Sequence, residues 1–467
     1  MQKKNPGTGS LRLAFYGDDF TGSTDALEVL AFAGLRCALF LNPPSAETLQ
    51  QFDEFDAIGI AGDSRSMSPA EMDDQLPSIF KALAGLNAPI VHYKVCSTFD
   101  SSPSIGSIGR VMEIARQTFG RAVIPIVAAT PALGRYCVFG HLFARSGTDG
   151  QTHRIDRHPI MRVHPVTPMI ESDLAQHLAR QTTLSIDKFG VANFAADRAG
   201  LDAALAALIS SQPDAVLFDG LTDAHMLEVG RLLEDHALRH SPAFVVGPSG
   251  VEYALTQWWR EGGVKTLARP DYASFAAVEK VLAISGSASA LSALQIDAAI
   301  AAGFADVPID ASELVDAHRW QTASSKLVSS VLALLMQGRS VMLHTARGPA
   351  DPRIEAMVSS LVSPGTSREQ AKHGGGRLLG LRLGLIVEAI LLAAPLRRLL
   401  LSGGDTSSQI TRVLAPDALE IEARLAPGAP LCRVISKQPH LRTLQIALKG
   451  GQMGDETYFV KALQGTA

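Results

Sequence analysis

Two aspartates, Asp18 and Asp19, stand side by side in the segment RLAFYGDDFTGSTDAL (residues 12–27), where an apolar run gives way to small hydroxyl-bearing residues. Adjacent carboxylates repel one another unless a cation, a proton or a substrate hydroxyl compensates them. Either the pair forms a solvated turn that caps a helix, or it is half of an active site in which one carboxylate orients or deprotonates a hydroxyl. The residue types alone leave both interpretations open.

A second group of polar residues follows other apolar runs in the first half of the chain. These residues lie in GDSRSMS (62–68), HYKVCSTFDSS (92–102) and VGPSGVEYAL (246–255). Arginine offers the bidentate geometry that a carboxylate accepts, and hydroxyls together with acids can hold a polyol. Each residue alone is more often a surface or capping group, but as a set at successive strand ends they predict a site for a small acidic, hydroxylated molecule. The candidate substrate-binding residues are Arg65, Lys94, Ser97, Thr98, Asp100, Gly247 and Ser249.

The second half carries three glycine- and serine-rich turns, SGSASALSALQ (285–295), SGGDTSSQI (402–410) and KGGQMGDE (449–456). Each follows an apolar run and offers glycine for close backbone approach, with hydroxyls or N–H groups at a helix start, which is the chemistry that cradles phosphates. One such turn is more often an ordinary connection, but three in one half favour a nucleotide site. The sequence contains neither GxxxxGK[ST] nor GxGxxG, so a P-loop and a dinucleotide fingerprint are excluded. The candidate nucleotide-binding residues are Ser285, Gly286, Ser287, Ser289, Gly403, Gly404, Asp405, Thr406, Lys449, Gly450, Gly451 and Gly454.

Short apolar runs alternate with helical patterns along most of the chain. The predicted strands are 11–16, 56–61, 89–94, 122–127, 215–220 and 243–247, and then 280–285, 339–345, 397–402 and 443–449. Continuous apolar strands followed by helices are typical of a parallel sheet covered on both faces. We therefore expect an α/β protein of two three-layer domains with mainly parallel sheets. The periodicity lapses over 260–275, which predicts an N-terminal domain of residues 1–265 and a C-terminal domain of residues 275–467.

Three segments depart from this rhythm. Residues 129–170 are rich in His, Arg, Pro and Gly, and we expect loops with a hairpin there, in which His158 and His164 are satisfied loop histidines. Residues 363–377 are predicted to form a mobile, glycine-rich loop. Residues 380–401 are the most lipid-like stretch, but interrupting charges and a proline favour a buried helix followed by a strand.

The composition bounds the class of protein. A chain of 467 residues is too long for one ordinary core. The net charge of −4, from 42 basic and 46 acidic residues, indicates no nucleic-acid partner. The four cysteines Cys37, Cys96, Cys137 and Cys432 form no CxxC pair, which fits a reducing cytoplasm. The first residues contain no apolar run long enough for a signal peptide, so we expect a cytoplasmic protein without a membrane partner.

Together these motifs resemble those of the four-carbon acid sugar kinases. In the first half, the ADDxTG turn of that family is matched by GDDFTGS (17–23), and its K-x-x-ST segment is matched by Lys94, Ser97 and Thr98. In the second half, the GSxSxxTxxQ, GGxT and KxGxxG patterns are matched by Gly286, Ser287, Ser289, Ser292 (in place of Thr) and Gln295, by Gly403, Gly404 and Thr406, and by Lys449, Gly451 and Gly454. The resemblance covers nearly the whole chain, and five motifs occur in the family's order.

The resemblance implies an ATP-dependent kinase of small sugar acids, with the acid in the N-terminal domain, ATP on the three turns of the C-terminal domain, and the reaction in a cleft between them. Such a reaction uses Mg²⁺ and a carboxylate that orients or deprotonates the attacking hydroxyl. Asp18 or Asp19 is the candidate base, and the sequence does not rank them. It indicates no metal ligands and leaves a homodimer open.

The segment after residue 94 bears on the substrate. Many members of the family read K-x-DST-LRG where this chain has KVCSTFDSS, a form that resembles the branch acting on 3-oxo-tetronates rather than on threonate or erythronate. That branch usually continues with GNIG, whereas this chain has SPSIGSIG. The substrate is therefore expected to be a 3-oxo-tetronate or a branched 3-oxo sugar acid such as 3-oxo-isoapionate, with D-threonate and D-erythronate as alternatives.

Two other classes of protein compete with the kinase. A two-domain oxidoreductase would need a dinucleotide site, whose fingerprint is absent from the sequence. A non-catalytic sensor of sugar acids would not need three phosphate-cradling turns. The kinase is therefore the favoured hypothesis.

Overall fold

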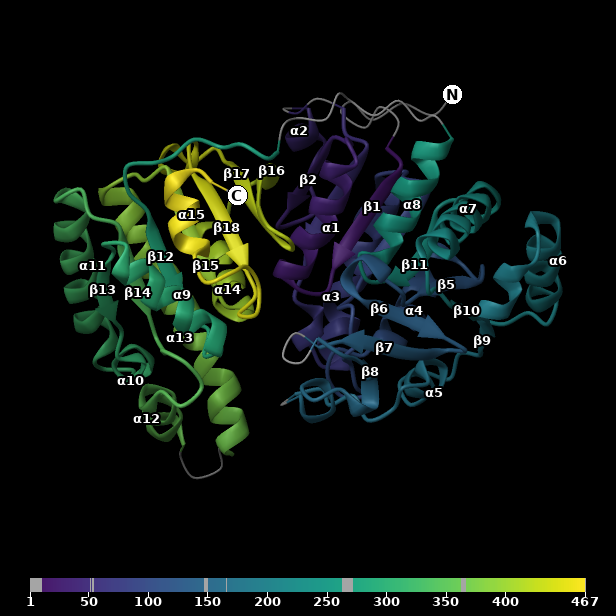
Figure 1. Ribbon diagram of the computed structural model, residues 1–467, viewed down its shortest axis with the longest axis horizontal. Coiled ribbons are helices and arrows are strands. Elements are labelled where there is room, and N and C mark those ends of the chain that lie inside the picture. Colours follow the sequence, from purple (N-terminus) through teal and green to yellow (C-terminus); the bar gives the residue numbers. More distant parts are fainter. Residues whose placement is uncertain are drawn as a thin grey trace. The chain divides into compact units, whose positions relative to one another are not determined.

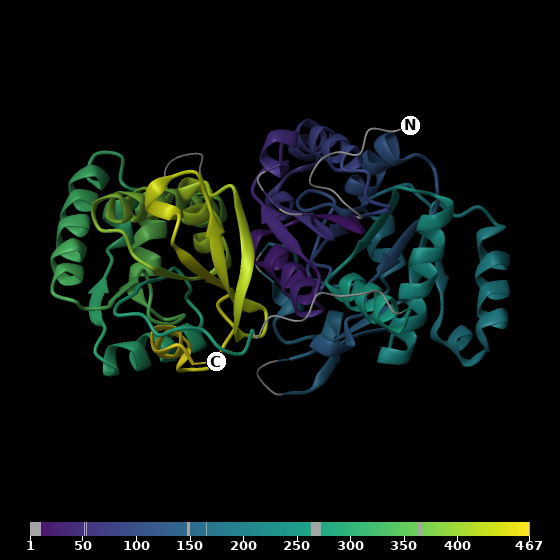
Figure 2. The same cartoon turned by 90° about the horizontal axis from the view of Figure 1, so that it is seen from above.

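The computed structural model describes residues 11–50, 52, 54–146, 150–164, 166–262, 272–362 and 367–466. The chain divides into two compact units, one of Met1–Cys37 and Asn42–Arg269, the other of Ala38–Leu41 and Pro270–Ala467. In each unit, helices cover both faces of a mainly parallel sheet, and the view from above shows the layers on edge (Figures 1 and 2). The predicted fold class is confirmed. Most of the expected boundary segment 260–275 lies outside the described residues.

The described sheet of the first unit is parallel throughout, in the order β3-β1-β4-β11-β5-β10-β9. Its strands are β1 (Leu13–Gly17), β3 (Ala57–Ala61), β4 (Ile90–Lys94), β5 (Ile124–Val127), β9 (Ile186–Phe189), β10 (Ala215–Phe218) and β11 (Ala243–Gly247). The strands of the centre of this sheet are buried along their whole length, as continuous apolar runs require. The six predicted strands of this half are confirmed, whereas β9 was not predicted.

Helices α1 (Phe20–Phe32), α7 (Asp223–Arg239) and α8 (Gly250–Glu261) pack together on one face of this sheet, and α3 (Pro69–Gly85) and α4 (Ile108–Phe119) on the other (Figure 1). The short α2 (Ala46–Leu49), α5 (Leu174–Ala179) and the longer α6 (Arg198–Ile209) belong to the connections. Helix α3 begins with a capping box in which Ser68 and Glu71 exchange hydrogen bonds.

The segment 129–170 forms a small antiparallel sheet rather than a single hairpin. Strands β6 (Arg135–Val138), β7 (His141–Arg145) and β8 (Thr152–Arg154) pair in that order. The His158 Nδ1 atom accepts hydrogen bonds from the backbone of Ile160 and Met161, and His164 Nδ1 accepts one from Thr167. Both histidines therefore hold loops, as expected.

The second unit has a mixed sheet in the order β13-β14-β12-β15-β18-β17-β16-β2. The first five strands are parallel, and the last three pair antiparallel. They are β12 (Leu282–Ser285), β13 (Ala305–Pro308), β14 (Val341–His344), β15 (Arg398–Ser402), β18 (Gln445–Lys449), β17 (Ala429–Ile435), β16 (Ala418–Ala426) and β2 (Cys37–Phe40). The four predicted strands of this half are confirmed, whereas β13, the β16–β17 hairpin and β2 were not predicted.

Helices α9 (Ala290–Ala301) and α15 (Tyr458–Gln464) pack on one face of this sheet, and α11 (Trp320–Met336), α13 (Arg368–Ala393) and α14 (Gly404–Leu414) lie on the other (Figure 1). The smaller α10 (Ala311–Val315) and α12 (Pro352–Leu361) pack against α13. The apolar core under α9 and α15 centres on residues such as Ile296, Leu400 and Phe459.

The prediction of a mobile loop over 363–377 is wrong from residue 367 onward. Ser367 and Gln370 form a capping box at the start of α13. Of the glycines that suggested a loop, Gly374 and Gly376 face open space, whereas a Cβ on Gly375 would lie 2.5 Å from Leu361 of α12. Further along α13, Gly380 and Gly384 permit close packing against α14, since a Cβ there would lie 2.8 Å from Gln409 and 2.6 Å from Val413. Residues 363–366 lie outside the described part.

The lipid-like stretch 380–401 forms the second half of α13 followed by strand β15, as predicted. Among the described residues, none of the helices has the length and apolar character needed to cross a membrane.

Candidate active site

The carboxyl ends of four adjacent strands of the first unit lie in register. Gly17 of β1 pairs with Ala61 of β3 and with Lys94 of β4, and Lys94 pairs with Gly247 of β11. The predicted catalytic and substrate-binding residues occupy this row or follow it directly in the chain. Open parallel sheets bind ligands at this edge.

Asp18 and Asp19 share one counter-ion, Arg65. The guanidinium donates from Nε and Nη2 to Asp18, at 3.0 and 2.7 Å, and from Nη1 and Nη2 to Asp19, at 3.1 and 3.0 Å. Backbone bonds fix the arrangement, because Asp18 N donates to Lys94 O and Arg65 N donates to Asp18 O. Four of the five N–H donors of Arg65 are therefore engaged. Its predicted role in holding a substrate carboxylate stays a prediction, and one donor is left for it.

The two aspartates differ in surroundings and in acidity. Asp19 caps α1, accepting a hydrogen bond from Gly22 N at 2.8 Å and from the Thr21 hydroxyl at 2.9 Å. Burial acts to raise its pKa, but Arg65, Lys94 and these hydrogen bonds outweigh burial, so the pKa lies below its usual value. Asp18 is nearly inaccessible, and burial raises its pKa against the opposing effect of Arg65. The pair therefore combines a permanently ionised cap with a more basic carboxylate.

Lys94 is the second cation, and its partner is Asp25, a residue that the sequence analysis did not single out. The Lys94 Nζ atom lies 3.7 Å from Asp25 Oδ2. Burial acts to lower the pKa of Lys94, but Asp25, Asp19 and Asp18 together raise it, so the ammonium stays charged. Gly22 makes room for this arrangement, since a Cβ there would lie 2.2 Å from Asp19 Oδ1 and 2.5 Å from Lys94 Nζ.

One feature of the sequence could have pointed to Asp25 as a site residue. It stands in the second turn of a helix whose other residues are mostly small or apolar, on the same side as Gly22. Burial raises its pKa, while Lys94 opposes that rise. The site therefore holds three carboxylates against two cations.

The segment after β4 supplies hydroxyls and another acid. The Thr98 hydroxyl donates to Asp100 Oδ1 at 2.7 Å, and Cys96 Sγ lies 3.0 Å from the same hydroxyl. Burial, reinforced by Asp100, raises the pKa of Cys96 to about 11, so this thiol stays protonated near neutrality. Ser97 is partly exposed and forms no hydrogen bond with any described residue, which leaves its hydroxyl available.

Gly247 and Ser249 lie beyond Lys94 in the row of strand ends. The Gly247 carbonyl accepts from Val95 N at 2.9 Å and faces His92 Nε2 at 2.8 Å. His92 Nδ1 is 2.6 Å from Glu252, with both side chains fully buried. The buried Ser249 hydroxyl lies near the Asp25 carboxylate without a well-formed hydrogen bond. Gly247 thus has its carbonyl occupied, and the Ser249 hydroxyl faces the Asp25 carboxylate.

In the second unit, too, the predicted site residues lie at the carboxyl ends of adjacent parallel strands. The last residues of its parallel strands, Ser285, Ser402 and Lys449, lie in register. The glycines that follow tie neighbouring turns together, since Gly286 N donates to Ser402 O and Gly403 N donates to Lys449 O, each at 2.9 Å. All three predicted phosphate turns therefore lie at one edge of one sheet.

The turn before α14 has the features of an anion site. Gly403 has φ +107°, and no side chain of the described residues caps the helix, so the N–H groups of its first turn have no side-chain acceptor there. A Cβ on Gly286 would lie 1.9 Å from the Thr406 hydroxyl, which explains the glycine there. Asp405 in the first turn of α14 is exposed and pairs with no described residue.

Residues of the 285–295 turn support the 449–456 turn. Ser289 Oγ donates to Gly451 O at 2.5 Å, and Gln295 Nε2 donates to Met453 O at 3.0 Å and to Asp455 O at 2.8 Å. Ser287 Oγ would lie 2.3 Å from a Cβ on Gly451, which again requires glycine. Ser289 and Gln295 therefore shape the neighbouring backbone, and direct nucleotide contact by Ser289 stays a prediction.

Lys449 is a buried cation without a carboxylate partner among the described residues. Its side chain is inaccessible, and Nζ donates to Gly450 O at 3.0 Å and lies 5.7 Å from the Tyr458 ring centroid. Burial lowers its pKa to about 8. A buried ammonium without a counter-ion is unfavourable, so the Lys449 side chain, beside three glycine-rich turns, is suited to binding an anion.

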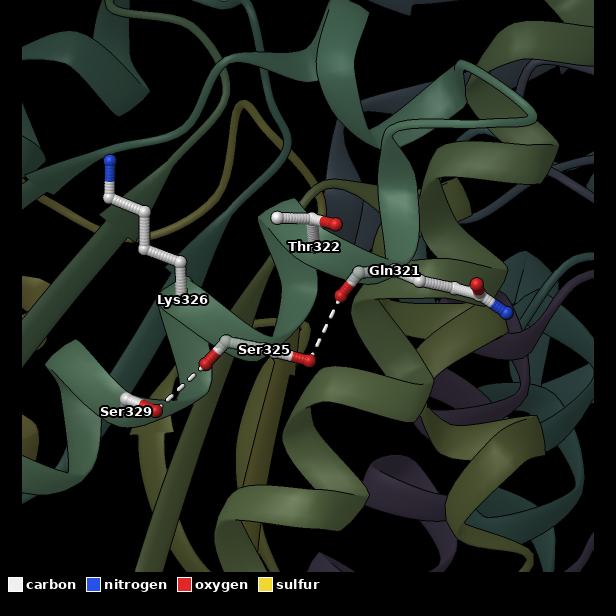
Figure 3. A pocket seen from close by; sticks show the side chains of 5 residues that line it. All are labelled: Gln321, Thr322, Ser325, Lys326 and Ser329. Atoms are coloured by element: carbon white, nitrogen blue, oxygen red, sulfur yellow. Dashed lines mark hydrogen bonds between the residues drawn. The ribbon is translucent and has the colours of Figure 1, made fainter.

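The described residues offer, away from the strand ends, neither a metal-binding cluster nor a pocket that is a better candidate for an active site. They contain no cluster of three or more His, Cys, Asp or Glu side chains suited to a metal ion. A pocket of about 480 Å³ lies on α11, lined by Gln321, Thr322, Ser325, Lys326 and Ser329 (Figure 3). All five side chains come from one helix, and both serine hydroxyls donate to backbone carbonyls of that helix. This pocket lacks the converging acids and cations of the strand edges.

The sequence matches family models and known kinases along nearly its whole length. The family model described as "Sugar-binding N-terminal domain" matches residues 13–255, and the one described as "Nucleotide-binding C-terminal domain" matches residues 282–459. The 3-oxo-isoapionate kinase of Paraburkholderia graminis is 41% identical over 97% of this chain and 94% of its own length. The 3-oxo-tetronate kinase of Pseudomonas fluorescens is 28% identical over 97% and 96%.

Solved structures share the fold. A crystal structure from Salmonella typhimurium LT2 superposes with a TM-score of 0.73 at 23% identity, covering 98% of this chain and 100% of that one. A Haemophilus influenzae protein gives a TM-score of 0.69 at 22% identity, with coverage of 96% and 98%. With the family models matching most of its length and a kinase 41% identical over nearly all of it, the chain belongs to the four-carbon acid sugar kinase family.

Proposed function

We propose that this protein is an ATP-dependent kinase that phosphorylates a hydroxyl of a small 3-oxo sugar acid, with 3-oxo-isoapionate as the first candidate and 3-oxo-tetronate as the second. The order follows the identity of 41% to a 3-oxo-isoapionate kinase against 28% to a 3-oxo-tetronate kinase. D-threonate and D-erythronate rank below these. The acid binds in the first unit and the nucleotide in the second. The cleft predicted between the two domains stays a prediction.

The observation that carries the nucleotide half of this proposal is Lys449. Its buried ammonium has no counter-ion among the described residues and lies next to three turns built for close anion approach. A triphosphate supplies the missing negative charge, and the uncapped start of α14 adds N–H donors for it. A sensor of sugar acids would not need that combination, and the sequence lacks the dinucleotide fingerprint that an oxidoreductase would need.

The acceptor half rests on the carboxylates of the first unit. Asp19, whose pKa is lowered, remains ionised and holds the turn, while Asp18, whose pKa is raised, is the better proton acceptor. The acceptor hydroxyl attacks the γ-phosphorus, its proton passes to Asp18, and ADP leaves. Lys94 and Arg65 keep the carboxylates oriented.

Magnesium fits the nucleotide turns. Mg²⁺ in kinases is held by one or two carboxylates together with phosphate oxygens, and it neutralises phosphate charge when bound. Asp405 is the candidate ligand, because an exposed carboxylate in the first turn of α14 would otherwise repel a triphosphate there. Asp455 is less suited, since it already pairs with Lys461 at 2.7 Å.

The proposal also bears on where the enzyme works. All four cysteines are free thiols, and the reaction consumes ATP. We therefore place the enzyme in the cytoplasm, where thiols stay reduced. A homodimer stays a prediction.

A coupled ADP-release assay with Mg²⁺ and a panel of C4 and C5 acids tests the function. The panel contains freshly prepared 3-oxo-isoapionate and 3-oxo-tetronate beside D-threonate and D-erythronate. We expect the highest kcat/KM with one of the 3-oxo acids, and no ADP release without an acid. Failure to release ADP with any acid would refute the proposed function.

A further inference from the structure

Arg135 is a half-buried cation at the start of β6, in the segment that sequence reasoning expected to be loops. One amino group of its guanidinium is firmly held. Nη1 donates to the carbonyls of Leu133 at 3.0 Å, Gly134 at 3.4 Å and Arg145 at 3.0 Å. These three bonds orient the plane of the guanidinium within the small antiparallel sheet.

The opposite edge of the same guanidinium is unpaired. Among the described residues, buried Nε has no hydrogen-bond partner and Nη2 donates to none. No described carboxylate forms an ion pair with this arginine. Burial accordingly lowers its pKa, opposed only by the nearby Cys96 when that residue is a thiolate. The Nε–Nη2 edge is one of the two faces that bind a carboxylate through parallel hydrogen bonds.

Other buried arginines of this chain show what a purely structural role looks like. Arg231 donates to three carboxylates, those of Asp202, Glu228 and Asp235. Arg398 has no carboxylate partner in the part of the chain that the structure describes, yet its Nε, Nη1 and Nη2 atoms all donate, to the Gln445 side chain and to two backbone carbonyls. Arg135 differs from both, because its Nε–Nη2 edge forms no hydrogen bond with the described residues. Arg12 also has a buried Nε without such a bond, but it precedes β1 and so lies at the opposite end of the strands from the substrate residues.

Arg135 lies at the edge of the sheet where the substrate residues gather. Its backbone pairs with Thr130, just beyond the end of β5, through bonds of 2.9 and 3.1 Å. Gly250, next to Ser249, also packs against Thr130, since a Cβ added to Gly250 would lie 2.8 Å from the Thr130 hydroxyl. The Cys96 thiol is within electrostatic range of both Arg135 and Arg65.

The other cations at this edge already have partners. Arg65 carries Asp18 and Asp19, and Lys94 faces Asp25. We propose that Arg135 binds the carboxylate of the sugar acid through its Nε–Nη2 edge and thereby selects acids over neutral polyols. This inference rests on the proposed function for the identity of the ligand.

Steady-state kinetics of Arg135→Gln and Arg135→Lys test the proposal. In Arg135→Gln we expect KM for the best acid of the panel to rise roughly 30-fold or more, since a buried charge pair loses one partner. kcat falls much less, and KM for ATP changes less than threefold. Arg135→Lys keeps the positive charge but loses the paired donors of the guanidinium, so we expect an intermediate effect, with KM for the acid rising roughly tenfold. Arg157→Gln is the matched control, because it removes an exposed arginine from the same segment.

A second measurement separates recognition from structural damage. Binding of each panel acid and of its reduced neutral polyol is measured by calorimetry without ATP. The wild-type protein should prefer the acid, and the preference should collapse towards unity in Arg135→Gln, which a merely structural role would not produce. If Arg135→Gln fails to fold, Arg135→Lys decides through the same acid-to-polyol ratio.

The outcomes distinguish this inference from the proposed function. Phosphorylation with an unchanged acid KM, or an unchanged acid-to-polyol ratio in the variants, overturns the role of Arg135 and leaves the kinase intact. Arg135-dependent acid binding without ADP release supports the inference and refutes the kinase. Absence of acid binding by the wild-type protein overturns the inference.

Discussion

Asp18 and Asp19 are neighbours in sequence but have distinct chemistry, because one faces inward and the other caps a helix. The Asp19 carboxylate accepts four hydrogen bonds, two of them from Arg65. Asp18 accepts two side-chain bonds, both from Arg65, and so retains lone pairs for a hydroxyl proton. The structure thereby ranks two residues that the sequence presents as equals.

Replacing either aspartate by asparagine should lower turnover far more than it affects ATP affinity. We expect kcat in Asp18→Asn to fall by about 10²-fold or more, as for loss of a general base. Asparagine still caps a helix, so Asp19→Asn should keep α1 and lose activity through the altered Arg65. Kinetics and ATP titration measure both effects, with Asp73→Asn, an exposed aspartate paired with Arg110, as control. Wild-type activity in both variants would remove the pair from the mechanism.

Lys449→Met should stabilise the free protein and weaken ATP binding. The folded-state pKa of about 8 lies below the usual 10.5, so the charged amine costs about 3 kcal/mol at neutral pH. Part of that cost should be recovered in the variant, raising the free energy of unfolding by about 1–3 kcal/mol at pH 7. ATP affinity should fall about tenfold or more. Denaturant unfolding and ATP titration test both, with the exposed Lys326→Met on α11 as control (Figure 3).

The same lysine makes the wild-type protein pH-dependent in a defined direction. Between about pH 8 and 10.5 the folded chain binds fewer protons at Lys449 than the unfolded chain, so this residue's contribution to the unfolding free energy rises with pH. ATP binding needs the charged amine, so its affinity should fall as pH rises above about 8. A dissociation constant for ATP that is flat from pH 7 to pH 10 would contradict this assignment.

The sequence predicts the helices, strands and turns whose positions depend on local residue patterns. The ten buried strands could be located because parallel strands are continuous apolar runs, and the site residues followed from the turns after them. Asp25 was missed because its role depends on Lys94, which is distant in sequence. The glycines at 374–376 were misread as a loop because the local pattern does not show that Gly375 packs against Leu361 of another helix. Arg135 gave no sequence signal, since an unpaired guanidinium edge is visible only in three dimensions.

The start of α14 offers a test at the level of one element. Gly404→Val places a branched side chain on the first helical residue, where the proposed phosphates approach. We expect ATP affinity to fall about tenfold or more by steric exclusion, while calorimetry shows acid binding unchanged. Gly374→Val, at a helix position of the same unit where a Cβ meets open space, controls for the valine itself. Equal ATP affinity in Gly404→Val and the wild-type protein would show that another turn binds the phosphates.

For the whole molecule, two compact units imply two separable ligand responses. Saturating acid at 100 times its dissociation constant should stabilise the wild-type protein by about 2.7 kcal/mol, and MgATP should do the same. Gly404→Val should keep the response to acid and lose that to MgATP, whereas Arg135→Gln should show the reverse. Thermal melts with each ligand measure this pattern. Loss of both responses in either variant would show that the two sites are not independent.

Strand β2 has a consequence for how this protein can be built and rebuilt. Ala38–Leu41 belongs to the second unit although β1 and β3, on either side of it in the chain, belong to the first. On the ribosome, the partner of β2, strand β16, emerges only after nearly four hundred further residues. Gene fusions that exchange sugar-acid domains between relatives must therefore carry a matching β2, and a nucleotide-binding unit expressed from residue 275 onward would lack one edge of its sheet.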